Sequence, residues 1–494
     1  MASEGIVHDA HGEADYTDGV NHTILPKIGV VLLLVTAIAF SPWNAVAAQR
    51  SPSSVKVFDP DPNHTWNRTY ACLFVRRTSD GTEYGADALD PLLWNETQHL
   101  LKGDSHRRAL ACLDVFLRSH AERAVQNPLK RAIFQRDLWA LFDWAAAGQS
   151  LPQQRRELEV RLADAIRRLA ITSEQVRALP DTYAAALAAQ QFAPAYDPLN
   201  SRRPFLPPEL FRSDGPWVCL SAYSDEPTAI VHFSGRSRFL VFMRLPGGRD
   251  ATLAYIHKLR SSSETPLLNS GSPSTRLNLA LPQFPAGTMV ALLRQMIVID
   301  NQGKLTPTAL TESVQLRVYH AITSGTEYMN YINGPSSHDQ DFFEFRIRRP
   351  DLFARRSGGL VLVQPGETEF ATFSTHGIDA FESTTPLDQR GGVLERCRAC
   401  HSDSGIHSVQ SRLQWMKLSR SLSTQTDGGK YGDPITWETV VKEIDRTVKK
   451  LTALKRTTAA ADRRILNLRI KSVRRLRTNV YSHCKALSVW PPRI

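Results

Sequence analysis

The stretch Asn127–Gly148, "NPLKRAIFQRDLWALFDWAAAG", predicts a helix with a well-marked beginning and end. Asn127 is a favoured N-cap residue, and Pro128 takes the first helical position, where the missing N–H of proline has no partner to lose. The apolar residues that follow recur every three or four positions, which is the period of one helix face. Gly148 then ends the pattern. These apolar residues are Phe134, Leu138, Leu141, Phe142 and Ala145.

Two more helices are predicted on the C-terminal side of this one. Ser150 and Pro152 begin the first of them, and Thr172 with Gln175 resembles the capping box that begins the second. We therefore expect an N-terminal α-helical domain over residues 49–200, with an irregular leader at 49–100. The apolar face of the helix that begins at Pro152 is formed by Leu158, Leu162, Ile166 and Leu169.

The hydrophobic period changes after the proline-rich linker "FAPAYDPLNSRRPFLPPELF" at 192–211. Apolar and polar residues now alternate, as they do in a strand with one buried face. We interpret residues 201–376 as an antiparallel β domain resembling a sandwich. The alternating triplets are Leu277, Leu279 and Leu281; Val314, Leu316 and Val318; and Phe343, Phe345 and Ile347. The continuous apolar runs are "FLVFM" at 239–243, "MIVID" at 296–300 and "LVLV" at 360–363.

The amino terminus predicts export. Residues 28–40, "IGVVLLLVTAIAF", form an apolar run of signal-peptide length after Lys27, and small residues follow it. The first 26 residues fit this pattern less well, because they carry five acidic residues and no lysine or arginine. The alternative is an uncleaved membrane anchor over 28–48. Residues 1–48 are thus an N-terminal tail with a signal peptide or anchor, and we expect the protein to be periplasmic or extracellular.

An exported chain can form disulfides. Four cysteines lie outside the motif discussed next, which allows one or two disulfides, but their pairing does not follow from the sequence. If the source glycosylates exported chains, N-x-T triplets such as the one at Asn67 are acceptors. The four cysteines are Cys72, Cys112, Cys219 and Cys484.

The segment 377–430 contains "CRACH", from Cys397 to His401. Residues three apart lie on the same face of a helical turn, so Cys397 and Cys400 can present both sulfur atoms in one direction. Two such thiols can each add to one vinyl group of a haem, and the next residue, His401, can then reach the iron. One short segment therefore satisfies both covalent attachment and axial ligation.

"CRACH" resembles the haem-attachment motif of c-type cytochromes, and the resemblance is confined to the segment around it. It implies one covalent haem c, with Cys397 and Cys400 as thioether anchors and His401 as the proximal iron ligand. It also implies electron transfer outside the cytoplasm, in agreement with the expected export.

The sixth ligand of the iron stays open. Small cytochromes c usually supply a methionine well beyond the motif, whereas here the one later methionine is Met416, only 15 residues on. His376, upstream, and His407, six residues after the motif histidine, are alternatives, and so is an open position. The choice matters because the sixth ligand affects the reduction potential of the haem, and because an open sixth position would let the iron bind a small molecule.

The same cysteines are also compatible with a site that holds no haem. Cys397 and Cys400 can be half of a zinc site completed by His483 and Cys484, a redox-active dithiol, or a structural disulfide. The functions to compare are an electron carrier with a redox partner protein, a haem-dependent oxidoreductase with catalysis in the α or β domain, and a non-redox binding protein. We assign no catalytic residue, because no phosphate loop, nucleophile elbow or H-E-x-x-H motif is present.

The last segment, 431–494, predicts a basic helical hairpin. It holds 15 lysines and arginines against 5 acidic residues, and so accounts for about +10 of the chain's net charge of +11. Such a surface is a solvated helix face, or it docks to an acidic redox partner or an anionic membrane surface. We do not expect nucleic-acid binding, because an exported protein rarely meets nucleic acid.

Overall fold

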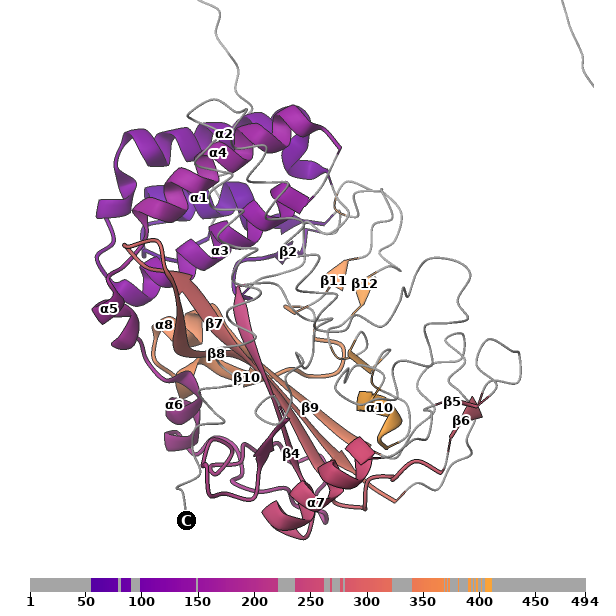
Figure 1. Ribbon diagram of the computed structural model, residues 1–494. Coiled ribbons are helices and arrows are strands. Elements are labelled where there is room, and N and C mark those ends of the chain that lie inside the picture. The colour runs from indigo at the N-terminus through magenta and orange to yellow at the C-terminus, as the bar shows by residue number, and fades with distance from the viewer. Residues whose placement is uncertain are drawn as a thin grey trace, which may run out of the picture. The chain divides into compact units, whose positions relative to one another are not determined.

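The computed structural model describes most of the chain between residues 55 and 410 (Figure 1). The described ranges are 55–78, 81–89, 98–147, 150–220, 236–261, 267–268, 276–278, 280–321, 340–367, 369–370, 372–373, 381, 390–391, 394, 397–398, 401 and 405–410. The predicted signal segment and basic hairpin lie outside these ranges. All described residues belong to one compact unit that begins at Pro52.

The first half of this unit is helical. Its helices are α1 (Thr65–Phe74), α2 (Gly103–Arg118), α3 (Pro128–Ala147), α4 (Pro152–Arg168), α5 (Ser173–Arg177) and α6 (Thr182–Ala188). Single 3₁₀ turns occur at His99–Leu101, Ala121–Arg123 and Ser357–Gly359. In the described ranges of the second half, the helices are α7 (Gly248–Ser261), α8 (Arg349–Phe353) and α10 (His407–Gln410).

The predicted helix boundaries in the first half are confirmed. α3 begins at Pro128, and the Asn127 side chain accepts a hydrogen bond from the Lys130 N–H at 3.2 Å. Thr172 and Gln175 form the complete capping box that begins α5. The predicted apolar face of α4 is buried at all four positions, Leu158, Leu162, Ile166 and Leu169.

The expected irregular leader is partly wrong, because it contains α1. This helix begins after His64, whose side chain accepts a hydrogen bond from the Trp66 N–H, and histidine is not a common N-cap. Trp66 and Tyr70 are completely buried in the main hydrophobic core. Asn67 is buried as well, and its side chain bonds to the backbone at 58, 59 and 61, so in the folded chain it cannot be a glycan acceptor.

The second half is built on a six-stranded antiparallel sheet in the order β10-β9-β8-β7-β4-β3. The strands are β3 (Val218–Cys219), β4 (Ser237–Arg244), β7 (Met289–Ile299), β8 (Leu305–Tyr319), β9 (Gln340–Ile347) and β10 (Leu360–Leu362). Three two-stranded ribbons accompany it: β1 (Arg76–Arg77) with β2 (Glu83–Tyr84), β5 (Leu267–Leu268) with β6 (Arg276–Leu277), and β11 (Thr372–Phe373) with β12 (Arg390–Gly391).

The chain therefore has helices and antiparallel sheets, as the periodicity predicted, and most of the predicted strands lie within β4, β7, β8, β9 and β10. Two details differ. The triplet at 277–281 contributes only the end of β6. The sequence "GRDATLAYIHKLRS" forms α7, a helix inside a region for which we predicted strands only.

The two sides of the sheet are covered differently. In β8, Val314, Leu316 and Val318 point into the main core, which also holds residues of α1 to α6. On the opposite side, Tyr319 packs in a second core with residues of α7 and α10, and Phe342 of β9 packs in a small third cluster. We call the first side the helix-facing side and the second the motif-facing side. In Figure 1, α5 and α6 lie to one side of the strands and α10 to the other.

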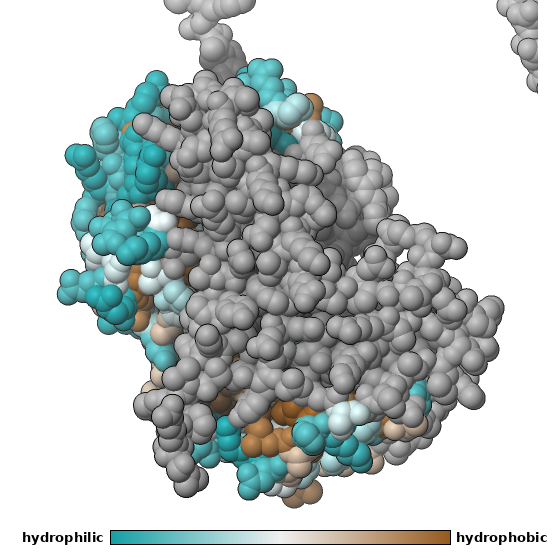
Figure 2. Space-filling view, in the orientation of Figure 1, coloured by the Kyte–Doolittle hydropathy of each residue, from teal (hydrophilic) through white to brown (hydrophobic). Residues whose placement is uncertain are grey.

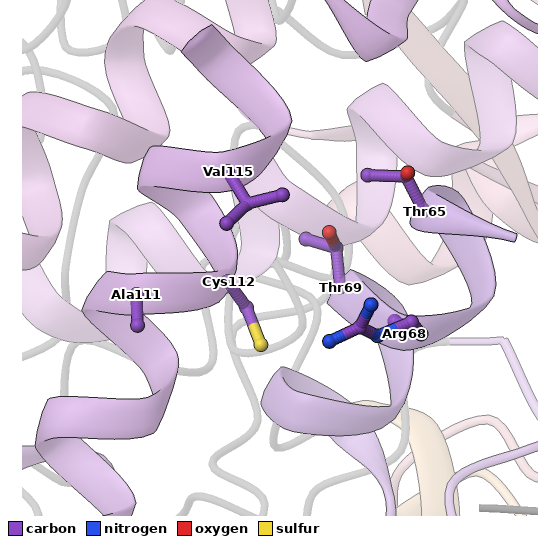
Figure 3. A pocket seen from close by; sticks show the side chains of 6 residues that line it. All are labelled: Thr65, Arg68, Thr69, Ala111, Cys112 and Val115. Atoms are coloured by element: carbon purple, nitrogen blue, oxygen red, sulfur yellow. The ribbon is translucent and has the colours of Figure 1, made fainter. Parts of the chain in front are cut away.

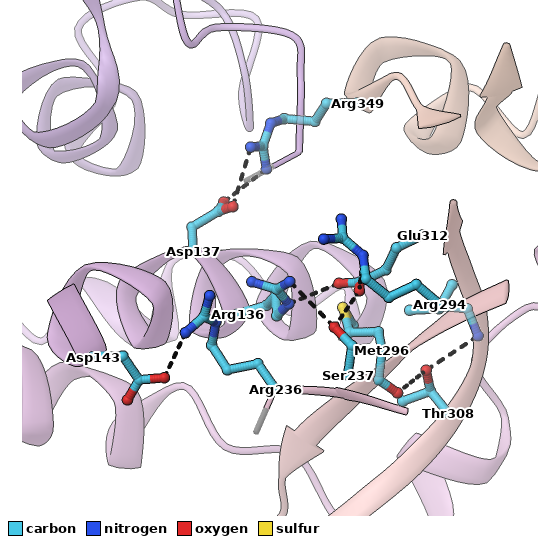
Figure 4. Close-up of polar contacts among 11 residues, drawn as sticks. Arg136, Asp137, Asp143, Arg236, Ser237, Arg294, Met296, Thr308, Glu312 and Arg349 are labelled. Carbon is cyan, nitrogen blue, oxygen red and sulfur yellow. Dashed lines mark hydrogen bonds and ion pairs between the residues drawn. The ribbon is translucent and has the colours of Figure 1, made fainter. Parts of the chain in front are cut away.

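The helix layer contains buried ion pairs (Figure 4). Arg349 binds Asp137 through both terminal nitrogens, at 2.7 and 3.2 Å, and donates to the Tyr70 hydroxyl at 2.8 Å. Arg136 of α3 pairs with Glu312 of β8 at 2.7 Å, and neither side chain is exposed. Each of these buried guanidinium groups thus has a carboxylate, which offsets the cost of removing it from water.

A disulfide between Cys72 and Cys112 joins α1 to α2 across a sequence separation of 40 residues. A small cavity of about 100 Å³ lies beside it, lined by Thr65, Arg68, Thr69, Ala111, Cys112 and Val115 (Figure 3). The cavity is too small for more than a few water molecules.

The outer surface of the helix layer is hydrophilic, as the upper left of Figure 2 shows. Within the described part of the chain, no helix is both long and apolar enough to cross a membrane. The candidate span at 28–48 lies outside that part.

Candidate functional site

The described part of the motif lies on the motif-facing side of the sheet. Cys397 and His401 both have helical backbone conformation, whereas Cys400 lies outside the described residues. Of the candidate sixth ligands, Met416 and His376 also lie outside them. His407 is the first residue of α10, but its side chain is not described. Of the three motif side chains that we predicted to lie together, the structure therefore places two, Cys397 and His401.

His401 is buried, with 5% of its surface exposed, and its Nδ1 atom has a defined partner. Nδ1 lies 2.9 Å from the backbone carbonyl oxygen of Ser408. A carbonyl oxygen can only accept, so Nδ1 must carry the proton and donate it. In the neutral ring Nε2 then holds the lone pair, and Nε2 is the nitrogen that can bind a metal.

Ser408 joins this imidazole to the sheet. Its hydroxyl oxygen lies 2.8 Å from the Gly405 carbonyl, 2.6 Å from the Tyr319 hydroxyl and 3.1 Å from Arg317 Nη1. Because the single hydroxyl proton goes to the Gly405 carbonyl, Ser408 must accept hydrogen bonds from both Tyr319 and Arg317. Burial raises the pKa of Tyr319, although Arg317 and Ser408 oppose this effect, so the phenol keeps its proton and can donate it.

Arg317 contacts the same carbonyl as His401. Its Nη1 atom lies 3.3 Å from the Ser408 carbonyl oxygen, and the residue is 3% exposed. Its guanidinium group also lies 5.9 Å from the centre of the Tyr319 ring. In the part of the chain that the structure describes, no carboxylate pairs with Arg317. The chain thus buries a positive charge against neutral partners, directly beside the motif histidine.

Further hydrogen bonds attach the motif segment to the sheet and to the loop before β7. Gln340 of β9 donates through Nε2 to the His401 carbonyl oxygen at 2.5 Å. The Ile406 N–H donates to Gln283 Oε1 at 3.2 Å. His401 and α10 are therefore held on the sheet at several points.

Cys397 is half-buried in apolar surroundings. It packs against a cluster formed by Ala88, Val363, Phe370 and Leu394, with Phe342 and Val361 at its edge. Its neighbour Arg398 places its guanidinium 5.9 Å from the centre of the Phe342 ring. Cys397 therefore lies beside apolar side chains at the edge of the sheet.

The sequence identified Cys397 and His401 but not the polar side chains beneath them. In the alternating pattern, Gln315, Arg317 and Glu344 occupy the half expected to face solvent, yet they are only 5%, 3% and 3% exposed. Arg317 is buried against Ser408 of the segment that contains the motif, and Gln315 and Glu344 lie 3.4 Å apart in a hydrogen bond. The sequence contained one signal of this polar layer, because the residues expected on this side of β8 and β9 include several polar ones. The alternating pattern does not predict which segment covers this side of the sheet.

His401 fits the role of an iron ligand, because its Nδ1 proton is held by a backbone carbonyl. The hydrogen bond from Nδ1 to a carbonyl is the usual support of a metal-binding histidine, because it fixes the tautomer and the ring orientation. Among the residues described, no three His, Cys, Asp or Glu side chains lie close enough together to hold a metal ion.

Away from the motif, a larger cavity has a volume of about 550 Å³ and lies near α8. Lys56, Lys130 and Arg349 contribute positive charges to its lining, and Asp59, Glu83 and Asp87 contribute negative ones. Its volume is large enough for a small ligand. The balanced lining does not favour a particular ligand charge, and Arg349 is already bound to Asp137.

Comparison of the chain with protein-family models, with curated proteins and with solved structures found no match.

Proposed function

We propose that the protein is an exported c-type cytochrome that transfers electrons through one covalently bound haem. Cys397 and Cys400 would hold the haem by thioether bonds, and His401 would bind its iron through Nε2. When bound, the haem supplies a one-electron redox centre. The observation that carries the proposal is the hydrogen bond from His401 Nδ1 to the Ser408 carbonyl, which leaves the lone pair of the neutral ring on Nε2, where it could bind iron.

The surroundings of the motif support a redox centre more than a zinc site or a dithiol. Cys397 lies in an apolar cluster, and His401 is withdrawn from solvent on the sheet. Shielding from water and a fixed histidine ligand both reduce the rearrangement of solvent and protein when the iron gains or loses an electron. A smaller rearrangement favours electron transfer. The sixth ligand remains a choice between Met416, a histidine such as His376, and an open position.

The disulfide supports export. Disulfides are rare in proteins of the reducing cytosol and persist in the periplasm and outside the cell. The Cys72–Cys112 disulfide joins two helices of the main core, and so it is part of the fold. We propose that residues 28–48 direct export, as a cleaved signal or as an anchor.

The rest of the predicted layout belongs to this proposal. It comprises the attachment segment 377–430 and the basic hairpin 431–494, which follow the helices and the sheet that share the main core. The hairpin would dock to an acidic redox partner protein or to an anionic membrane surface.

The direct test is the pyridine haemochrome spectrum of the full chain, expressed with the cytochrome c maturation machinery and exported. We expect one haem per chain that resists acid–acetone extraction. Cys397→Ser and Cys400→Ser should each remove one thioether, and the double variant should retain no covalent haem. Cys219→Ser, which changes a half-buried cysteine outside the motif, is the matched control and should keep the haem. A wild-type chain of unmodified mass would overturn the proposal.

A haem-dependent oxidoreductase is the second candidate, with an open sixth position at the iron for peroxide, or with the haem as electron conduit to a substrate bound elsewhere, such as in the cavity of about 550 Å³. The loaded protein would then turn over peroxide or a small electron donor, and His401→Ala would abolish the turnover. A carrier would show reversible reduction and no turnover.

A further inference from the structure

The motif histidine and a buried arginine use the same backbone oxygen. His401 Nδ1 lies 2.9 Å from the Ser408 carbonyl oxygen, and Arg317 Nη1 lies 3.3 Å from it. Arg317 belongs to β8, where it lies opposite Val290 of β7 and Phe342 of β9. Its position is therefore set by the sheet and not by the motif segment.

The side-chain hydrogen bonds that the structure describes for Arg317 lead to Ser408. Nη1 donates to the Ser408 hydroxyl at 3.1 Å as well as to its carbonyl, and the Tyr319 hydroxyl holds the same serine at 2.6 Å. Ser408 is completely buried. Since the guanidinium is fixed against this residue, its charge acts on the carbonyl that accepts the imidazole proton.

We propose that Arg317 is a positioning residue that raises the reduction potential of the haem through the Ser408 carbonyl and His401. The inference rests on the function proposed above and names the residue that regulates the same site.

The direction follows from two effects that agree. A carbonyl that also accepts from a cation draws less strongly on the imidazole proton, so His401 remains a weaker electron donor to iron. A buried positive charge beside the ligand histidine also disfavours the oxidised form of the haem, which carries one more positive charge than the reduced form. Both effects favour the reduced state.

The test is a redox titration of the haem-loaded full chain. Arg317→Met, which keeps an unbranched side chain without the charge, should lower the reduction potential. Arg317→Lys keeps the charge and should restore most of the wild-type value. Arg212→Met is the control, because it removes the same charge from an exposed arginine that pairs with Asp214, and it should leave the potential unchanged.

The outcomes separate the two proposals. If the wild-type chain carries haem and Arg317→Met leaves the potential unchanged, the role of Arg317 is wrong and the cytochrome proposal stands. If the wild-type chain carries no haem, both are wrong.

A second measurement needs no haem. ¹⁵N-histidine NMR of the chain made without haem attachment should find the neutral His401 ring protonated at Nδ1, in wild type and in Arg317→Met. A ring protonated at Nε2 would contradict the hydrogen bond on which the inference depends.

Discussion

Arg349 and Arg317 are both buried, on opposite sides of the sheet, but they have different partners. Arg349, in the helix layer, binds Asp137 through two hydrogen bonds and also reaches the Tyr70 hydroxyl. Arg317, on the motif-facing side, has a serine and a tyrosine ring as its described partners. The Asp137 carboxylate neutralises the charge of Arg349. The charge of Arg317 instead polarises the Ser408 carbonyl that it contacts. The buried charge of the helix-facing side is therefore neutralised, whereas that of the motif-facing side is held by neutral groups beside His401.

The largest effect on stability is expected from removing the carboxylate that neutralises Arg349. Asp137→Ala should lower the free energy of unfolding by about 3–5 kcal/mol, because Arg349 stays buried without its counter-charge. Urea denaturation followed by tryptophan fluorescence measures this loss. Asp214→Ala, which breaks an exposed pair with Arg212, should leave the midpoint unchanged. An equal loss in both variants would remove the basis of the comparison.

A slightly smaller effect is expected from the apolar residues of the helix-facing side. Leu316 is completely buried in the main core, so Leu316→Ala should cost about 2–5 kcal/mol through lost burial and the cavity left behind. Thermal unfolding gives the change. Val115→Ala, at a position on α2 that is 43% exposed, is the control and should change stability by less than about 0.5 kcal/mol. A small cost at Leu316 would mean that the helices pack loosely on this side.

Asp300 allows a test by pH at the hairpin that joins β7 to β8. Burial alone would raise its pKa, but hydrogen bonds from Ser173, Thr306 and the backbone N–H groups of Lys304 and Gln302 hold that pKa below its usual value. A lowered pKa in the folded state stabilises the fold above the unfolded pKa of about 3.9, and this stability is lost as the pH falls through the folded value.

The corresponding variant is Asp300→Asn, which should be less stable than wild type by about 1–3 kcal/mol at neutral pH. The difference should disappear in acid, as denaturation measured at a series of pH values from neutral to strongly acidic would show. Asp250→Asn, at an exposed position in the first turn of α7, is the control. A difference that persists in acid would mean that the carboxylate charge is not what matters.

The smallest effect on stability is expected at Arg317. Replacing a buried charge that lacks a carboxylate among the described residues by an apolar side chain removes a desolvation cost together with its hydrogen bonds. Arg317→Met should therefore change the free energy of unfolding by less than about 1 kcal/mol. A loss as large as that of Asp137→Ala would show that Arg317 supports the fold in the same way as Arg349, and the contrast between the two sides would fail.

The sequence predicted the regular parts of the fold well, because their signals are local. The cap at Asn127, the capping box at Thr172 and the alternation at Val314, Leu316 and Val318 each depend on neighbours within a few residues. α1 was missed because its N-cap is a histidine. α7 was missed because strands precede and follow it.

Of the candidate site, the sequence singled out the motif residues but not the polar side chains beneath them. The spacing of Cys397 and His401 is a property of the sequence, whereas the contact of Ser408 with Arg317 joins residues 91 positions apart. The alternating pattern of β8 shows that Gln315 and Arg317 share a side of the strand. It cannot show that Ser408, from a later segment, contacts Arg317.

The polar side chains on the motif-facing side of the sheet have a consequence for the order in which the chain folds. The segment that contains His401 and α10 follows every strand of the six-stranded sheet in sequence, so during synthesis the sheet can form before its cover arrives. Gln315, Arg317 and Glu344 tolerate water in the meantime, whereas a wholly apolar side would invite aggregation. On the proposed function, attachment enzymes would act on Cys397 and Cys400 before this segment closes over the sheet.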